Sequence, residues 1–401
     1  MSFSIATSGL NAVTEQLNAI SNNIANSGTV GFKSGRAEFS ALYAESQPLG
    51  VGVSGITQSI TKGGSIASTG TALDLAINGN GFFMVRDSAG TTAYTRAGYF
   101  GTDSNGNLIN NQGMYMQGYP VDANGTLQVG SIGNLTISSG SIPAKATESI
   151  DFTANLDARA EVPATSPFDP KDNTTYNNSY TTQVYDSLGR EHTMNQYFVK
   201  TGENEWEVHY YMDDKPVTDA NGANQVQKMT FNSQGILTNP SGAVDLSAAI
   251  PGADNIDIKL TYNNTTQYGS DFSVSKNKGD GYASGERTGQ AIDEDGSVYA
   301  TFSNGERLLQ GQLVLANFTN PNGLQSQDGT TGAQTASTGA PLTGAPGTGL
   351  LGSIVSGALE SSNVDLTSEL VGLMTAQRNY QANTKVISTN DSMMNALFQA
   401  V

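Results

Sequence analysis

Glycine and proline are concentrated in the middle of this chain, and their distribution limits which parts can be helical. Neither residue occurs between Leu10 and Ser27 or between Leu373 and Val401, whereas most of the intervening sequence is rich in both. Both residues disfavour helix interiors and favour turns. The distribution therefore predicts a helix at each end of the chain and a β-rich middle.

The predicted N-terminal helix carries one narrow apolar stripe. Its apolar residues are separated alternately by three and four positions, which is the spacing of a heptad seam. The other positions are mainly Asn, Thr, Gln and Ser, and Glu15 is the only charge before Lys33. The stripe consists of Leu10, Val13, Leu17, Ile20 and Ile24.

The predicted C-terminal helix begins near Asp365, which is a suitable N-cap, and Glu369 lies favourably in its first turn. Its stripe is less regular because Gln377, Thr384 and Asp391 fall on the same seam. The apolar and aromatic positions of this stripe are Leu366, Leu370, Leu373, Tyr380, Ile387, Met394 and Leu397.

A helix with one narrow stripe is not stable alone in water, so each of these helices needs a partner. The helices could dock on the body of their own domain, or they could pair with each other and with neighbouring subunits. The second arrangement is slightly favoured because segments that look flexible, at 25–70 and 322–362, separate both helices from the β region.

The middle of the chain is typical of short antiparallel strands. Residues alternate in "SYTTQVY" and "EWEVHYYM", and Asp or Asn is followed three positions later by Gly at 103, 122, 186, 232 and 293. The predicted fold is mainly β with α-helical termini that pair as a coiled-coil core, and one β-rich domain is inserted in another. The predicted parts are a helix at 1–24, an extended linker at 25–70, a body domain at 71–145 plus 285–358, an inserted domain at 146–284 and a C-terminal helical segment at 359–401.

Composition excludes several functions. The net charge of −17 argues against nucleic-acid binding, and the lack of cysteine excludes thiol catalysis and thiolate metal sites. No apolar run is long enough to span a membrane, and the N-terminal residues lack the features of a Sec signal peptide. We therefore expect a chain that is either cytoplasmic or exported by another route.

Candidate ligand and catalytic motifs fail for physical reasons. Gly50, Gly52 and Gly55 match a phosphate-binding pattern, but a β-like stretch follows where a helix is needed. The Asp-x-x-Gly turns lack the other ligands of a calcium loop. His192 and His209 lie in strand-like segments without a second ligand at metal spacing, and no G-x-S-x-G elbow is present. We expect no metal, cofactor or catalytic site, although paired carboxylates of a carbohydrate-active enzyme leave no spacing signature.

Both ends of the chain resemble the bacterial flagellar rod and hook family of axial proteins. The resemblance covers "SGLNAVTEQLNAISNNIANSGTVGFKS" at 8–34 and "LESSNVDLTSELVGLMTAQRNYQANTKVISTNDSMMNALFQAV" at 359–401. The stretches 70–85 and 94–110 also resemble the shared body domain of the family. The motif residues are Ala25, Asn26, Gly31, Phe32, Lys33, Asn363, Asp365, Gln377, Arg378, Tyr380, Gln381 and Asn383.

The resemblance implies a structural subunit without enzymatic activity. Within the family, the chain length and the insertion favour the hook, the flexible universal joint that transmits torque from rod to filament. Expected partners are further copies of the chain, the distal rod, hook cap and hook–filament junction proteins, and the type III export apparatus. The expected location is extracellular, in the flagellar hook and basal body. Alternatives are a distal rod or other axial subunit and, less favoured, an extracellular β-rich adhesin.

Overall fold

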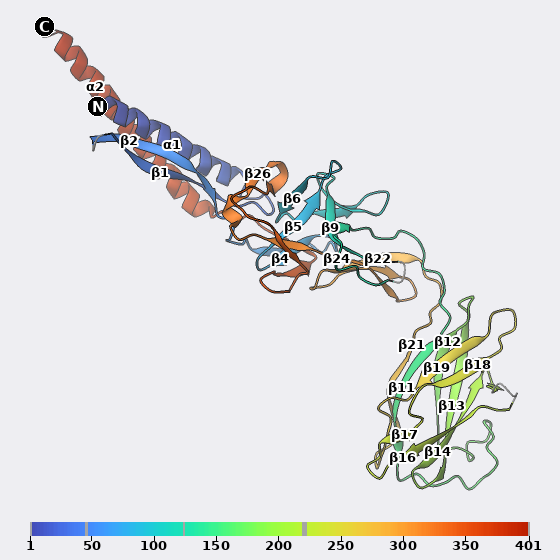
Figure 1. The fold of residues 1–401 in the computed structure, drawn as a ribbon. Coiled ribbons are helices and arrows are strands. Elements are labelled where there is room, and N and C mark those ends of the chain that lie inside the picture. Colours follow the sequence, from blue (N-terminus) through green and yellow to red (C-terminus); the bar gives the residue numbers. More distant parts are fainter. Residues whose placement is uncertain (1, 45–46, 123–124, 219–222, 400–401) are drawn as a thin grey trace. The chain divides into compact units, whose positions relative to one another are not determined.

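The computed structural model describes residues 2–44, 47–122, 125–218 and 223–399, which form two compact units. The first unit comprises residues 1–139, 289–301 and 307–401, and the second comprises 140–288 and 302–306. The chain is mainly β-structure with a helix near each end, as the glycine and proline distribution predicted (Figure 1). None of the described helices is long and apolar enough to cross a membrane.

The first unit holds both long helices and the β body. Its helices are α1 (Ser2–Ala25) and α2 (Leu366–Gln399), and short 3₁₀ turns span Pro321–Gly323 and Asp328–Thr330. Its strands, wholly or for the most part, are β1 (Gly35–Ala44), β2 (Gln47–Gln58), β3 (Ile66–Ser68), β4 (Leu75–Asn78), β5 (Phe82–Arg86), β6 (Thr92–Thr95), β7 (Phe100–Thr102), β8 (Leu108–Asn110), β9 (Tyr115–Pro120), β10 (Gly133–Asn134), β22 (Arg287–Ile292), β23 (Ser297–Phe302), β24 (Arg307–Leu313), β25 (Leu315–Asn317), β26 (Gln325–Gln327), β27 (Thr331–Ala333), β28 (Leu342–Gly344), β29 (Ser353–Ser356) and β30 (Ala358–Glu360).

The main sheet of the body joins early and late parts of the chain. Its strand order is β22-β23-β24-β9-β5-β6-β27-β26, and its buried side chains include Phe83, Val85 and Leu313. The last two strands before α2 in sequence form further antiparallel pairs, β29 with β4 and β30 with β3. These pairs bring the segment that follows α1 close to the segment that precedes α2.

The predicted turns are present where the structure describes them. At 103, 186, 232 and 293 the glycine N–H donates to the carbonyl of the Asp or Asn three residues earlier, and each glycine has a positive φ. The turn at 122 includes residues 123–124, which lie outside the described residues. Short-range turn chemistry therefore located these hairpins from sequence alone.

The expectation of an extended linker over 25–70 is wrong. Strands β1 and β2 form an antiparallel hairpin within this segment, and both strands pack against α1. Ala37 of β1 is buried, and helix α1 is the element against which the hairpin packs. A two-stranded hairpin is marginal alone, so contact with the helix stabilises a segment that has no core of its own.

The segment 322–362 is also not a flexible connection. It contains β26 to β30, and these strands pair with each other and with β3, β4, β6 and β25. Its small residues permit close approach between strands: a Cβ added at Gly352 would collide with the carbonyl oxygen of Asn78. The low-complexity segment is therefore part of the paired strands of the first unit.

The second unit consists of two β-sheets around one apolar core. One sheet has the order β18-β19-β11-β20 with β21 on β11, and the other has the order β12-β13-β14-β16-β17 with β15 on β14. Trp206, Phe152 and Leu260 are fully buried between them. The strands are β11 (Ser149–Asp157), β12 (Asn178–Tyr185), β13 (Glu191–Gly202), β14 (Glu205–Met212), β15 (Lys215–Pro216), β16 (Val226–Phe231), β17 (Leu237–Asn239), β18 (Val244–Ala248), β19 (Ile256–Thr261), β20 (Thr266–Tyr268) and β21 (Ser273–Gly279).

His192 connects two turns of the second unit by contacts to carboxylates. Its Nδ1 lies 2.6 Å from Oδ2 of Asp213, and its Nε2 lies 3.2 Å from Oδ2 of the buried Asp186. Carboxylates only accept hydrogen bonds, so the imidazolium form satisfies both contacts. Burial lowers the pKa of His192, but the hydrogen bonds to Asp213 and Asp186 outweigh it and raise that pKa above its ordinary value.

We expect the second unit to lose part of its stability as pH rises through the raised pKa of His192. A raised pKa stabilises the folded state below the unfolded value of about 6.5, and this contribution disappears above the folded pKa. The His192→Gln variant should be about 1 kcal/mol less stable than the parent at pH 5.5, because Asp213 is half-exposed, and nearly equal to it at pH 9. Urea unfolding followed by Trp206 fluorescence measures this, and a pH-independent difference would contradict the expectation.

Candidate functional site: the paired termini and their junction with the body

Helices α1 and α2 pack side by side through part of their predicted stripes (Figure 1). Val13 and Ile20 of α1 and Ala376 of α2 form a buried apolar cluster. Three partly buried residues of the predicted seams pack against this cluster. They are Leu17, Ile24 and Leu373.

The two helices run antiparallel, and α2 is the longer of the two. Near the start of α1, a Cβ added at Gly9 would lie 3.0 Å from side-chain atoms of Asn383. Near its end, Nδ2 of Asn23 donates to Oε1 of Glu369 at 3.0 Å. Because α2 has 34 residues and α1 has 24, the last turns of α2 extend beyond the beginning of α1.

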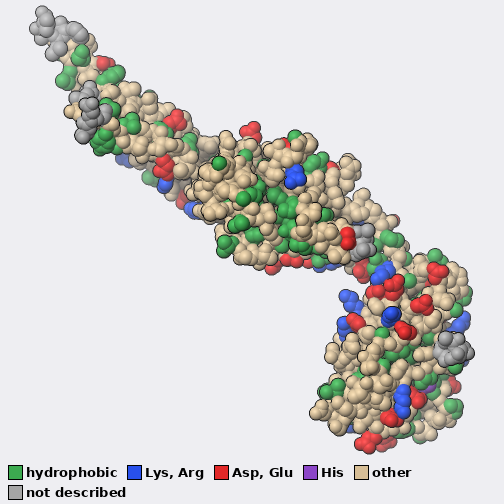
Figure 2. Space-filling model, viewed as in Figure 1, with side chains coloured by type: hydrophobic (Ala, Val, Ile, Leu, Met, Phe, Trp, Pro, Cys, Tyr) green, Lys and Arg blue, Asp and Glu red, His purple; other side chains and the backbone are tan. Residues whose placement is uncertain are grey.

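A large part of the predicted stripe on α2 is not covered by α1. Leu366, Leu370, Tyr380 and Met394 are between 42% and 51% exposed, and Ile387 is half-buried. On α1, Leu10 is also half-buried, and the side chain of Leu397 lies outside the described residues. Figure 2 shows hydrophobic side chains at the surface of this end of the first unit. The helix pair therefore presents apolar surface that one copy of the chain does not bury.

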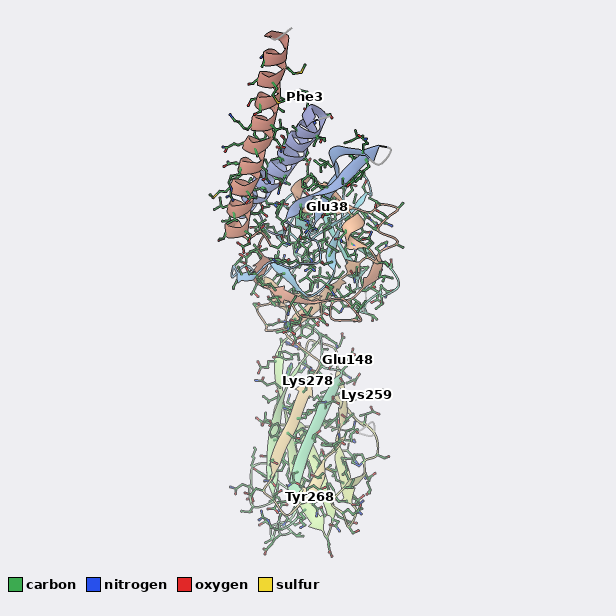
Figure 3. The ribbon with its side chains drawn as sticks, turned by 90° about the vertical axis from the view of Figure 1, so that its left-hand side faces the viewer. Phe3, Glu38, Glu148, Lys259, Tyr268 and Lys278 are labelled. Carbon is green, nitrogen blue, oxygen red and sulfur yellow. The ribbon has the colours of Figure 1, made fainter. Side chains whose placement is uncertain are left out.

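Helix α1 lies between α2 and the β1–β2 hairpin (Figure 3). Asn23 fixes the base of the hairpin: its Nδ2 donates to the carbonyl of Gly35, and its Oδ1 accepts the N–H of Gly35, both at 2.8 Å. Ser8 Oγ accepts the N–H of Val51 at 3.2 Å. The hairpin also carries exposed large apolar residues, namely Phe39, Leu42, Tyr43, Leu49, Val53 and Ile56.

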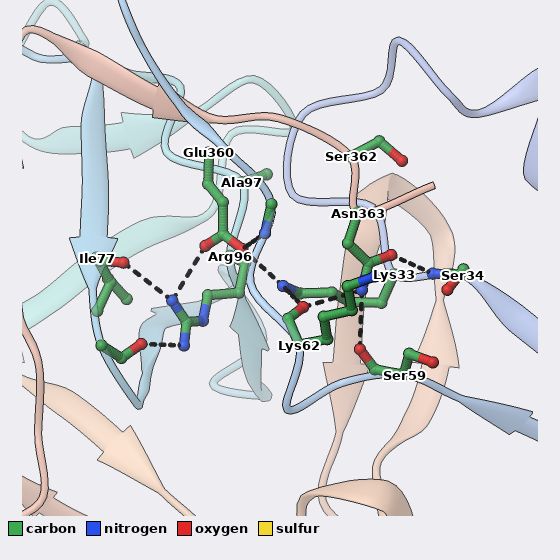
Figure 4. A network of polar contacts seen from close by, with 12 residues as sticks. Lys33, Ser34, Ser59, Lys62, Ile77, Arg96, Ala97, Glu360, Ser362 and Asn363 are labelled. Atoms are coloured by element: carbon green, nitrogen blue, oxygen red, sulfur yellow. Dashed lines mark hydrogen bonds and ion pairs between the residues drawn. The ribbon is translucent and has the colours of Figure 1, made fainter. Parts of the chain in front are cut away.

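A buried ionic cluster connects the loop after α1, the body and the strand before α2 (Figure 4). Oε1 of Glu360 accepts from Nζ of Lys33 at 2.6 Å, and its Oε2 accepts from Nη1 of Arg96 at 3.0 Å. These three side chains are only 2–8% exposed. Burial lowers the pKa of Lys33 and of Arg96, and the carboxylate of Glu360 opposes that effect at both. The carboxylate is therefore the counter-charge that both cations require.

Asn363 extends the same junction toward α2. Its Oδ1 accepts the N–H of Ser34 at 2.8 Å, and its Nδ2 donates to the carbonyls of Ser59 and Lys62 at 2.9 Å. Its own N–H donates to the carbonyl of Phe32 at 3.3 Å. One amide side chain thus ties the C-terminal motif to the N-terminal motif and to the loop after β2.

Gly31 permits the backbone to pass close to the body. Its φ is +70°, and a Cβ there would lie 2.5 Å from the backbone nitrogen of Ala97. Its N–H donates to the carbonyl of Glu360 at 2.8 Å. Only glycine combines this left-handed conformation with this approach at little cost.

The structure brings some of the predicted motif residues together and leaves others at the surface. Lys33, Gly31, Phe32 and Asn363 meet in the junction, and Asp365 caps α2 by accepting the N–H groups of Thr367 and Ser368. At the end of α1, Nδ2 of Asn26 donates to the carbonyl of Asn22, and Oδ1 of Asn26 accepts from the hydroxyl of Thr29. The exposed motif residues are Ala25, Gln377, Arg378, Tyr380 and Gln381.

Sequence reasoning missed three residues that hold this site together: Asn23, Arg96 and Glu360. Asn23 lies on the polar side of the predicted stripe, and Arg96 and Glu360 lie within stretches that resemble the flagellar family. Their spacing in the chain carries no signal, because their partners come from distant segments. Among the described residues, no group of three His, Asp or Glu side chains could hold a metal ion.

Four protein-family models match separate parts of the chain. Residues 3–33 match the flagella basal body rod protein model, and 76–155 match the flagellar hook protein FlgE/F/G D1 domain. Residues 155–282 match the flagellar basal body protein FlaE D2 domain, and 355–400 match the flagellar basal body rod FlgEFG protein C-terminal model. The matches define a protein of the flagellar rod and hook class.

The chain belongs to the flagellar hook protein family. It is 43% identical to the flagellar hook protein FlgE of Salmonella typhimurium and 40% identical to that of Escherichia coli K12, and each alignment covers 99% of both chains. The flagellar hook protein FlgE of Brucella suis is 32% identical over 97% of this chain and 96% of its own length. These relatives do not favour the distal rod or adhesin alternatives.

A solved structure shares the fold. The crystal structure of Helicobacter pylori flagellar hook protein FlgE2 matches with a TM-score of 0.54 and 15% sequence identity. The match covers 74% of this chain and 100% of that one.

Proposed function

We propose that this chain polymerises into the flagellar hook, the flexible joint that transmits torque from rod to filament. The observation that carries the proposal is the incompletely buried α1–α2 pair. Apolar side chains such as Leu370, Met374 and Tyr380 remain exposed along α2 in a single copy. The hydrophobic effect favours burial of such surface against other copies of the chain.

The paired helices form the inner core of the polymer in this proposal. The apolar residues of α1 and α2 belong to a coiled-coil core that is completed by neighbouring subunits, and the exposed apolar residues of the β1–β2 hairpin add to the contact surface. A contact between unlike surfaces of identical subunits, related by a rotation that does not close, generates an open helical filament. The extracellular flagellar hook is therefore the proposed location.

The remaining parts of the proposal follow from family membership. Subunits pass unfolded through the type III export apparatus, and the absence of cysteine suits that route. The distal rod, hook cap and hook–filament junction proteins are the proposed neighbours in the flagellum. Bending as the hook turns involves sliding of β domains across one another. The role is structural and includes no enzymatic step.

We expect purified protein to lengthen sheared flagellar hook fragments, because the fragment ends supply the missing partners of the helices. Electron microscopy of fragments labelled with antibody against residues 146–284 measures this. The expected result is label confined to a curved segment that grows with added protein. Protein incubated without fragments is the control for spontaneous aggregation. Label on the straight rod would instead support an axial rod subunit, and label on neither structure would refute assembly.

A further inference from the structure

The buried ionic cluster contains more positive than negative charge among its three members. Lys33 and Arg96 share the single carboxylate of Glu360, and each cation also donates to backbone carbonyls. Nζ of Lys33 donates to the carbonyl of Lys62 at 2.9 Å, and Nη2 of Arg96 donates to the carbonyl of Gly79 at 2.6 Å. Without Glu360, two cations would be buried side by side with only neutral acceptors, which is strongly unfavourable.

Among the residues that the structure describes, the hydrogen-bond partners of the Glu360 carboxylate all come from the N-terminal third of the chain. In addition to the two cations, Oε1 accepts the N–H of Gly64 at 2.9 Å. Lys33 and Arg96 are 327 and 264 residues away from Glu360 in sequence. Glu360 is also the last residue of β30, which pairs with β3. The N-terminal region therefore cannot bury its two cations until this late strand is in place.

Glu360 and its partner Lys33 each lie close in sequence to one of the two helices. Lys33 follows the end of α1 at Ala25 by eight residues, and Glu360 precedes the start of α2 at Leu366 by six. The ion pair between Lys33 and Glu360 thus holds the exit of one helix beside the entry of the other. Fully extended, the eight- and six-residue connections span at most about 29 Å and 22 Å, so paired helices keep Lys33 and Glu360 within a limited distance of each other.

We propose that Glu360 is a positioning residue that couples docking of the C-terminal strand to pairing of α1 with α2. Its carboxylate permits Lys33 and Arg96 to be buried, and their burial brings the two helices into register. The consequence for assembly rests on the proposed function: a subunit exposes a complete assembly core only after β30 has docked. In a chain whose C-terminal segment has not yet docked, α1 and α2 stay unpaired.

Helix pairing can be measured in the unpolymerised full chain because the protein has no native cysteine. Gly9→Cys and Asn383→Cys place a cysteine pair at the close approach of α1 and α2. The rate of disulfide formation under mild oxidation then reports how often the helices are paired. In this background, Glu360→Gln is expected to slow disulfide formation at least tenfold. The matched control is Glu38→Gln, which neutralises a more exposed, ion-paired carboxylate on the hairpin and should leave the rate unchanged (Figure 3).

A fully neutral triple variant separates the charge of Glu360 from its packing. Lys33→Gln, Arg96→Gln and Glu360→Gln together remove both cations and their counter-charge. We expect the triple variant to form the disulfide faster than Glu360→Gln alone, although it carries more substitutions. A triple variant as slow as or slower than the single variant would overturn the proposal, as would a Glu360→Gln rate equal to that of the control.

Hydrogen exchange distinguishes coupling from general unfolding. In Glu360→Gln, the amides of β3 and β30 should exchange faster while those of β5 and β9 remain protected. Loss of protection throughout the body would mean that Glu360 is an ordinary core residue, and the proposal would fail. Elongation of hook fragments is scored separately. If the parent does not elongate hook fragments but helix pairing still depends on Glu360, the assembly function fails and the coupling stands. Equal elongation by the parent and by Glu360→Gln would refute the role of Glu360 in assembly.

Discussion

Ile20→Asp is expected to abolish elongation of hook fragments by this protein. Ile20 is 7% exposed in the cluster that it forms with Val13 and Ala376 between the helices. An unpaired carboxylate in such a site costs several kcal/mol, and a cluster of three buried residues has little stability with which to offset that cost. We therefore expect α1 and α2 to separate. Electron microscopy of fragment elongation and circular dichroism of the unpolymerised protein measure the two effects.

The control for this experiment is Asn18→Asp on the same helix. Asn18 is exposed, so the new carboxylate stays in water while the net charge changes by the same amount. This variant should elongate fragments at a rate close to that of the parent. Trp206 fluorescence should be unchanged in both variants because that residue lies in the separate core of the second unit. Elongation by Ile20→Asp at the parental rate would show that the helix pair is not the assembly core.

Gly31→Ala is expected to destabilise the first unit by about 3 kcal/mol or more. A left-handed backbone conformation costs a residue with a side chain roughly 1–2 kcal/mol. The added methyl group would also lie 2.5 Å from the backbone nitrogen of Ala97 and 2.7 Å from the carbonyl carbon of Arg96. Relief of these contacts requires Arg96 or the loop after α1 to move, and either movement disturbs the ion pair with Glu360. Calorimetric unfolding of the full chain, with hydrogen exchange to assign the unit, measures the loss.

Gly28→Ala provides the matched comparison in the same loop. Nothing lies within 4 Å of the Cβ that this substitution adds, and Gly28 does not have a positive φ. We expect a change of at most about 0.5 kcal/mol, as for ordinary surface substitutions. Equal effects of the two substitutions would contradict the role of the close approach at Gly31.

Sequence patterns predicted the helices and turns, which depend mainly on residues that are close together in the chain. The glycine-free ends predicted both helices, and Asp365 predicted the beginning of α2, because helix propensity and capping act over a few residues. The Asp-x-x-Gly turns were predicted for the same reason. The spacing of Val13 and Ile20 also located the side of α1 that packs against α2.

Local patterns failed where pairing with a distant segment decided the structure. Residues 25–70 looked like a linker because their strands have little core of their own, but α1 supplies a surface on which the hairpin packs. Glu360 had no distinguishing neighbours in sequence, yet contacts across 264 and 327 residues make it the centre of the junction.

The amino-acid sequence alone was therefore enough to predict the class of fold, the two terminal helices and the family to which the chain belongs. The three-dimensional contacts were needed to show how much of each stripe is covered, how the hairpin is held and which charges are buried together. This difference arises from how far apart in the sequence the interacting residues lie. Periodicity, capping and turn formation are set within one or two turns of chain, whereas the burial of Lys33 and Arg96 requires a counter-charge that folding brings from the other end of the protein.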